Sequence, residues 1–331
     1  MSSTRFALCL ALISAPAAWS QAPGALPNPY KQPIEHWGTL PPGRTWGAAS
    51  GISIDRKGNI WIAERCGGAT CADSNLDPIL EFDPNGKYIR SFGGGMFVFP
   101  HQIFVDKNDN VWLADGNGKD GKGQVVVKFS PEGKVLMTLG KPGVAGNGPD
   151  TFNRPSGVVV APNGDIFVSD GHGGDSNNRV VKFSKDGKFI KAWGTKGKGP
   201  GEFDELHGIT IDSRGRVLVA DRGNNRIQIF DQDGMFLDQW TQFSRPSGIF
   251  IDSHDVMYVP DNTSVSTTRP NWPRGVRIGN AKTGEVTGFI PDRDQDPKDE
   301  GFGVENAVVD SKGSIFAVEV YRKMAEKFEK R

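Results

Sequence analysis

The sequence predicts an all-β protein, a closed ring of six four-stranded sheets, from three observations. A unit best seen in residues 203–234 alternates short apolar and β-branched runs with Asp/Gly turns, as antiparallel strands do. This unit occurs six times, and the two chain ends together complete one copy. One four-stranded unit cannot bury both of its faces alone, so the copies must pack side by side. The predicted fold is a six-bladed β-propeller.

Within the representative unit, four strands are expected in order, at residues 209–211, 217–220, 226–230 and 235–240. Asp/Gly turns separate the first strand from the second and the third from the fourth. A loop with Asn224 and Asn225 joins the second strand to the third. Each copy therefore reads as a meander of four antiparallel strands.

The six copies align on the residue that opens the first strand of each, namely Ser50, His101, Ser156, His207, Ser247 and Glu305. The spacings are 51, 55, 51, 40 and 58 residues, close to the length of a propeller blade. The differences in length are expected in loops, at 116–123, 142–153 and 263–274.

The chain ends predict how the ring closes. The last copy stops at its third strand, near residues 327–329, while residues 34–38 resemble the fourth strands of other copies. The N-terminal segment is therefore expected to supply the outer strand of the last blade, which removes an open sheet edge. This makes 34–331 the propeller, and the Pro-rich residues 21–33 an extended lead-in.

Residues 1–20 read as a secretory signal: Arg5 is followed by a short apolar run at 6–13 and by small residues at 18–20. The run is too short to span a bilayer. We therefore expect a secreted or periplasmic protein without a membrane span. Lys+Arg and Asp+Glu number 39 each, so no net charge favours nucleic acid or an anionic membrane as partner.

Two cysteines remain after removal of the signal, Cys66 and Cys71. In an exported protein such a pair predicts a disulfide. We expect this one to stiffen the loop that follows a strand.

The first-strand residues repeat around the central channel, and every second one is a ligand-type residue. His101, His207 and Glu305 alternate with three serines. Two imidazoles and a carboxylate around an open position form a catalytic zinc site, and non-haem iron uses the same residue types. The alternative is a polar channel in which these side chains are only hydrated or hydrogen-bonded.

The second strands end on the same face of the ring, each with an acidic residue that we expect to accept backbone N–H bonds. The residue or two that follow differ between copies. Arg65, His172 and Arg222 are the candidates near the metal face. Arg222 belongs to the ordinary repeat pattern, whereas Arg65 and His172 do not, so the latter two are the predicted catalytic residues.

The copies resemble NHL repeats in the pattern Pro-x-Gly-Ile…Asp…Gly…Val…Ala-Asp…Asn-Arg-Ile-Gln-Ile-Phe. The stretches FVSDGHGGDSNNRVVKFSKDGKFIKAWG and LHGITIDSRGRVLVADRGNNRIQIF resemble, more narrowly, peptidyl-α-hydroxyglycine α-amidating lyase. That family cleaves a C-terminal hydroxyglycine to a peptide amide and glyoxylate at a zinc held by three histidines. The resemblance implies zinc on His101 and His207 and a catalytic Arg65. The third family histidine falls on Glu305, and the catalytic tyrosine falls at or beside His172.

The same resemblance implies a structural calcium bound by the carbonyls of Ile52 and Ile103 and by an aspartate. The aspartate is here Asn306. Losing that carboxylate weakens a calcium site.

These features support an exported metal-dependent lyase or hydrolase that acts on a small polar substrate, such as an α-hydroxy amide or a peptide C-terminus. Zinc, or iron or manganese, is the expected cofactor, Arg65 holds a substrate carboxylate, and His172 takes a proton. One alternative is a non-catalytic propeller that binds a protein or glycan. A calcium-dependent lactonase-like propeller is less favoured, because hard cations prefer oxygen ligands to imidazole.

Overall fold

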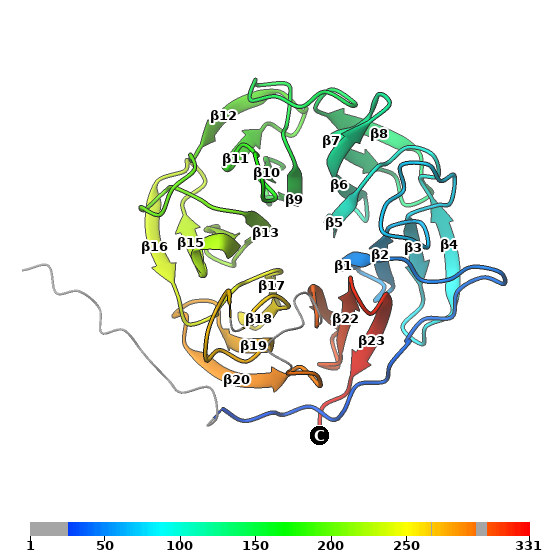
Figure 1. The fold of residues 1–331 in the computed structure, drawn as a ribbon, viewed down its shortest axis with the longest axis vertical. Coiled ribbons are helices and arrows are strands. Elements are labelled where there is room, and N and C mark those ends of the chain that lie inside the picture. The colour runs from blue at the N-terminus through cyan, green and yellow to red at the C-terminus, as the bar shows by residue number, and fades with distance from the viewer. Residues whose placement is uncertain (1–25, 266, 296–302) are drawn as a thin grey trace, which may run out of the picture.

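The computed structural model describes residues 26–265, 267–295 and 303–331, which form six sheets around a central axis (Figure 1). Five sheets have four strands and the sixth has three. Within each sheet, strands consecutive in sequence pair antiparallel, and the first strand lies nearest the axis. The predicted six-bladed β-propeller is confirmed.

The first three blades have the following strands: β1 (Ala49–Ile54), β2 (Ile60–Glu64), β3 (Ile79–Phe82), β4 (Tyr88–Phe92), β5 (Pro100–Val105), β6 (Val111–Lys119), β7 (Lys122–Phe129), β8 (Val135–Leu139), β9 (Pro155–Val160), β10 (Ile166–Asp170), β11 (Arg179–Phe183) and β12 (Phe189–Trp193).

The other three blades have these elements: β13 (Leu206–Ile211), β14 (Val217–Asp221), the short 3-10 helix η2 (Arg222–Asn224), β15 (Arg226–Phe230), β16 (Phe236–Trp240), β17 (Phe250–Ile251), β18 (Val256–Asp261), β19 (Gly275–Asn280), β20 (Val286–Pro291), β21 (Asn306–Val309), β22 (Ile315–Glu319) and β23 (Met324–Phe328).

Two details differ from the sequence-based expectation. The first strands of the last two blades begin late, so Ser247 and Glu305 lie just before β17 and β21. Part of the expected loop at 116–123 is instead a continuation of β6 and β7. Asp120 and Gly121 both have positive φ, 51° and 75°, which suits the tight turn of a two-residue hairpin.

The apolar core lies between the blades. Six clusters of buried side chains are seen in the described residues, and each is shared by two neighbouring blades. One of them joins the last blade to the first. Burial between blades is therefore continuous around the ring, which fixes the strands that line the channel.

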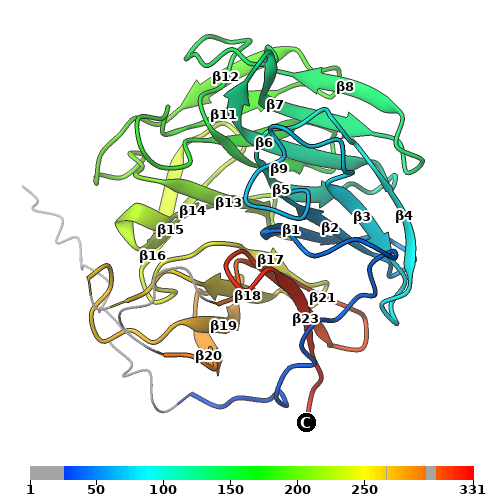
Figure 2. The ribbon, with the colours of Figure 1, turned by 45° about the vertical axis from the view of Figure 1, so that its right-hand side comes forward.

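The N-terminal segment pairs with the last blade, as predicted, although through the isolated bridges Tyr30–Lys330 and Ile34–Lys327 rather than a continuous strand. The backbone N–H groups of Ile34 and Lys327 donate to each other's carbonyl oxygen at 2.7 and 3.0 Å. Figure 2 shows this segment running beside β23. The contacts also extend back before residue 34: Tyr30 is 1% exposed and its hydroxyl donates to Gly313 O. Part of the expected lead-in thus belongs to the blade, while the signal at 1–20 lies outside the described residues.

Neighbouring blades also pack closely at a glycine in the turn between the third and fourth strands. Each such glycine has positive φ; Gly86, Gly133, Gly234 and Gly284 face an aromatic ring from the preceding outer segment, whereas Gly187 faces Met137 and Leu139. A Cβ added at Gly234 would lie 2.6 Å from the Trp193 ring, and one at Gly86 would lie 3.3 Å from the Trp37 ring. Trp37 therefore takes the place of an outer-strand aromatic.

Cys66 and Cys71 form the predicted disulfide, with 5.1 Å between their Cα atoms. It closes the loop directly after β2. Nowhere in 26–265, 267–295 or 303–331 does a helix have the length and apolarity needed to cross a membrane.

Candidate metal centre

The two first-strand histidines are held in the same way. His101 and His207 are each 1% exposed, and their Nδ1 atoms lie 2.6 Å from the carbonyl oxygens of Ser156 and Ser247, respectively. A carbonyl oxygen only accepts, so Nδ1 carries the proton and donates. Metal-binding histidines are oriented by this kind of bond, because it leaves the Nε2 lone pair free.

The two Nε2 atoms and one carboxylate meet at the channel mouth. Both Nε2 atoms are buried and lack a hydrogen-bond partner within the described residues. Glu305 Oε1 lies 2.9 Å from His207 Nε2 and 3.9 Å from His101 Nε2. Asn262 donates to Glu305 Oε2 and accepts a hydrogen bond from Ser247 Oγ at 2.6 Å. The structure thus brings together the three predicted ligand residues and orients the carboxylate.

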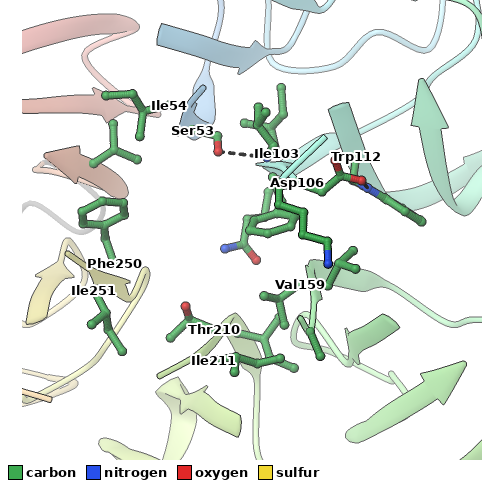
Figure 3. A pocket seen from close by; sticks show the side chains of 18 of the residues that line it. Ser53, Ile54, Ile103, Asp106, Trp112, Val159, Thr210, Ile211, Phe250 and Ile251 are labelled. Carbon is green, nitrogen blue, oxygen red and sulfur yellow. Dashed lines mark hydrogen bonds between the residues drawn. The ribbon is translucent and has the colours of Figure 1, made fainter. Parts of the chain in front are cut away.

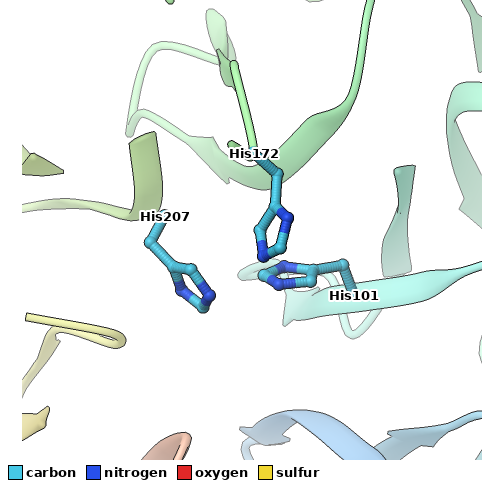
Figure 4. Close-up of side chains that lie close together, drawn as sticks. All are labelled: His101, His172 and His207. Carbon is cyan, nitrogen blue, oxygen red and sulfur yellow. The ribbon is translucent and has the colours of Figure 1, made fainter. Parts of the chain in front are cut away.

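His172, predicted as a proton acceptor, lies in the same cluster. Its ring centroid is 4.5 Å from that of His101 and 5.0 Å from that of His207. Each histidine offers a nitrogen, and these nitrogens all lie within 4.8 Å of one another. Figure 4 shows the three rings pointing toward one another from β5, β13 and the loop after β10.

The charge states suit cation binding. Burial, together with nearby positive charge, lowers the pKa of all three histidines below the usual value, so the imidazoles are neutral. Burial also opposes ionisation of Glu305, but its contact with His207 and the positive charge of Arg222 outweigh burial and hold the carboxyl pKa below its usual value. Neutral imidazoles and an ionised carboxylate are the forms that bind metal.

Arg65 lies beside the three histidines, and part of its guanidinium has no hydrogen-bond partner among the described residues. The group stacks 3.5 Å from the centre of the Phe99 ring, and Nε donates to Pro100 O at 3.3 Å. The Nη atoms make no hydrogen bond to any described residue. Burial lowers the Arg65 pKa to about 10, which still leaves a cation at neutral pH.

The guanidinium of Arg222, by contrast, is already paired with a carboxylate. Its Nη2 atom lies 2.9 Å from Glu205 Oε1, and Arg245 approaches the other oxygen of Glu205 at 3.2 Å. Arg65 is therefore better placed than Arg222 to hold an anion.

Five of the six acidic residues that end the second strands accept backbone N–H bonds, as expected, whereas Glu319 accepts from the side chains of Arg293 and Arg322. Asp115 accepts from Val98 and Phe99, and Asp170 accepts from Asn153. These carboxylates fix the loops that carry the site.

Along the first strands beyond the histidines, the channel holds a cavity of about 620 Å³ lined by both apolar and polar residues (Figure 3). Ile52, Ile103 and Asn306, the expected calcium-site residues, all line it. Gln102 lines it too, and its Oε1 atom is buried without a hydrogen-bond partner in the described part of the chain. The structure thus adds one oxygen donor to this region.

Three site residues were missed from sequence: Phe99, Gln102 and Asn262. Asn262 directly follows the acid that ends β18, the position that Arg65 occupies after β2. The repeat alignment therefore contained the information needed to select Asn262. Nothing in the repeat pattern marks Phe99 or Gln102 as a site residue.

Comparisons with known proteins agree with this architecture. A family model described as a 6-bladed beta-propeller matches residues 152–244. The human NHL repeat-containing protein 3 is 35% identical over 178 residues, which cover 52% of this chain and 48% of that protein. A probable peptidyl-alpha-hydroxyglycine alpha-amidating lyase of Caenorhabditis elegans is 31% identical over 210 residues, 58% of each chain. The chain thus matches about half the length of these relatives.

Among solved structures, a gluconolactonase from Xanthomonas campestris superposes with a TM-score of 0.60, covering 87% of both chains at 14% identity. At that identity the likeness shows the fold alone. The repeats, the ring and these relatives together lead to one conclusion: the chain is a six-bladed β-propeller of NHL-type repeats, homologous to NHL repeat-containing protein 3 and to amidating lyases.

Proposed function

We propose that this protein is an exported metal-dependent lyase or hydrolase, similar to the amidating lyases. Its metal, zinc or else iron or manganese, is bound by His101, His207 and Glu305 at the mouth of the channel. The substrate is small and polar, an α-hydroxy amide or a peptide C-terminus.

One observation carries the proposal. The Nε2 atoms of His101 and His207 are buried without hydrogen-bond partners in the described structure, and both face the Glu305 carboxylate. An unpaired buried nitrogen costs free energy. The donor set, with each Nδ1 already held by a carbonyl, fits a divalent cation that would satisfy both nitrogens.

The chain's own groups suggest how the substrate is held. Arg65 presents free Nη atoms, and a guanidinium binds a carboxylate through two parallel hydrogen bonds. His172 is neutral and lies beside both other imidazoles, so it can accept a proton or bind the cation. When bound, the metal supplies Lewis acidity, which polarises a substrate oxygen or acidifies water.

A second cation site is part of this proposal. The carbonyls of Ile52 and Ile103 and the side chain of Asn306 are the calcium donors, and Gln102 Oε1 adds a fourth oxygen. All four residues line the same cavity. Without a carboxylate, we expect this site to bind calcium weakly.

Metal analysis of the purified mature protein tests the proposal. One tightly held transition metal per chain is expected, with strong loss in His101→Ala and Glu305→Ala. Glu305→His should keep the metal, since it restores an imidazole. His254→Ala is the matched control, because His254 is exposed and distant in sequence from the cluster.

A second experiment measures glyoxylate release from a peptide that ends in α-hydroxyglycine. Release that depends on the metal supports the lyase reaction. Bound metal without release would contradict that reaction, and unchanged metal content in both alanine variants would refute the site.

The alternative is a non-catalytic propeller that binds a protein or glycan. It is favoured by the similarity to NHL repeat-containing protein 3, whose name carries no reaction. Absence of bound metal in the purified wild-type protein would support this alternative.

A further inference from the structure

We propose that His172 is a metal ligand, so that the centre has four protein donors: three imidazoles and the Glu305 carboxylate. This inference rests on the metal site proposed above, which it extends from three donors to four. It also replaces the expected role of His172 as a proton acceptor.

The first argument is the symmetry of the cluster. The His101 ring centroid lies 4.5 Å from both the His172 and the His207 centroids, and the third separation is 5.0 Å. The three donor nitrogens lie within 4.8 Å of one another. His172 packs directly against both of the other imidazoles.

The second argument is the space that makes this packing possible. The first-strand residue of the blade that carries His172 is Ser156, which is small. Its hydroxyl is paired with Ser169 Oγ at 2.9 Å. A large residue at position 156 would compete for the volume between His101 and His207. Because a serine stands there, the third imidazole reaches this space from the end of the second strand.

The third argument is how the loop aims the ring. The backbone N–H groups of Gly171 and His172 both donate to Arg154 O at 3.0 Å. A Cβ at Gly171 would lie 2.8 Å from Asn178 N, so only glycine allows this close approach. No hydrogen bond to the His172 ring occurs within the described residues. These contacts hold the backbone that carries His172, and its ring nitrogens remain free for a ligand.

The proposed donor set has consequences for the metal. Catalytic zinc usually has three protein ligands and one open position. Three imidazoles and a carboxylate already fill a tetrahedron, so an open position for substrate requires five or six ligands. Iron and manganese accept octahedral sites with nitrogen and oxygen donors. We therefore expect the centre to favour these metals over tetrahedral zinc.

X-ray absorption spectroscopy of the Mn²⁺-loaded and Zn²⁺-loaded mature protein counts the imidazoles directly. Three are expected in the wild type and in His254→Ala, and two in His172→Ala. Chelator competition should show that His172→Ala binds each ion at least about tenfold more weakly, a loss seen even for outer-shell partners. His172→Gln provides a second variant of similar size, and circular dichroism confirms that each variant is folded.

Two imidazoles in the wild type, unchanged in His172→Ala, would overturn this inference and leave the three-residue site standing. A wild-type protein that binds neither ion would overturn both proposals.

Discussion

Trp37 packs edge-on against Phe316, with ring centroids 4.8 Å apart, although the two residues lie near opposite ends of the chain. The same indole lies 5.9 Å from the Phe82 ring in the first blade. One side chain from the N-terminal segment therefore contacts both the last blade and the first. The N-terminal segment therefore holds the last blade by side-chain packing as well as by backbone hydrogen bonds.

Trp37→Ala should lower the free energy of unfolding by about 3–5 kcal/mol, the usual cost of deleting a large buried ring. Urea denaturation monitored by circular dichroism measures it. Ile34→Ala is the control, because Ile34 pairs in the same segment but is 49% exposed; its cost should stay within about 0.5 kcal/mol. Equal losses in the two variants would show that the indole is not what holds the ring closed.

Gly234→Ala should destabilise the protein more than Gly201→Ala. Both glycines have nearly the same positive φ, 79° and 77°, so both variants carry a backbone cost of about 1–2 kcal/mol. At Gly234 the new Cβ would lie 2.6 Å from the Trp193 ring, whereas nothing lies within 4 Å of the one at Gly201. Overpacking should add about 1–3 kcal/mol at Gly234. Superimposable denaturation curves would argue against the blade-locking contact.

Much of this architecture could be predicted from the sequence, because a repeat places equivalent residues at equivalent positions in space. The alignment of His101, His207 and Glu305 predicted that they share one end of the channel, and their atoms meet there. The same register placed His172 near this face but not in contact with the other two imidazoles, since its position depends on a loop held by Arg154 O. Nor could it show that Arg222 is paired with Glu205 while Arg65 is not. Glu205 lies in the loop before β13, outside the strands that the repeat aligns.

Arg65→Ala should lower kcat/KM for the α-hydroxyglycine peptide by on the order of 100-fold, the loss typical of removing a key donor. Arg65→Lys should recover little of it, because an ammonium lacks the two-pronged geometry. Arg222→Ala should have a smaller effect, as that guanidinium already binds Glu205. Steady-state kinetics with metal-loaded protein measures all three. Equal losses at Arg65 and Arg222 would remove the assigned role of Arg65.

Stability should depend on pH through Glu326. Burial and repulsion from Glu319 raise the pKa of this carboxyl to about 8, despite attraction to Arg293. Between about 4.3, the ordinary value for glutamate, and 8, the folded protein keeps a proton that the unfolded chain has released. Stability contributed by this group therefore falls as pH rises through that window.

Glu326→Gln removes this titration. The variant should gain stability relative to the wild type between pH 5 and pH 8.5, as measured by urea midpoints across that range. Parallel curves for the two proteins would mean that Glu326 ionises normally in the folded state.

Because the last blade joins residues from the two ends of the described chain, it is the last blade that can be completed during synthesis. Blades one to five can form as the chain emerges, but the sixth waits for β23 to meet the segment around Ile34. The segment around Ile34 is therefore made before every strand but pairs only when β23 has been made. A ribosome that stops before residue 324 releases a ring that cannot close, and its apolar blade faces remain open to proteases. Closure of the ring therefore requires β23 as well as the segment around Ile34.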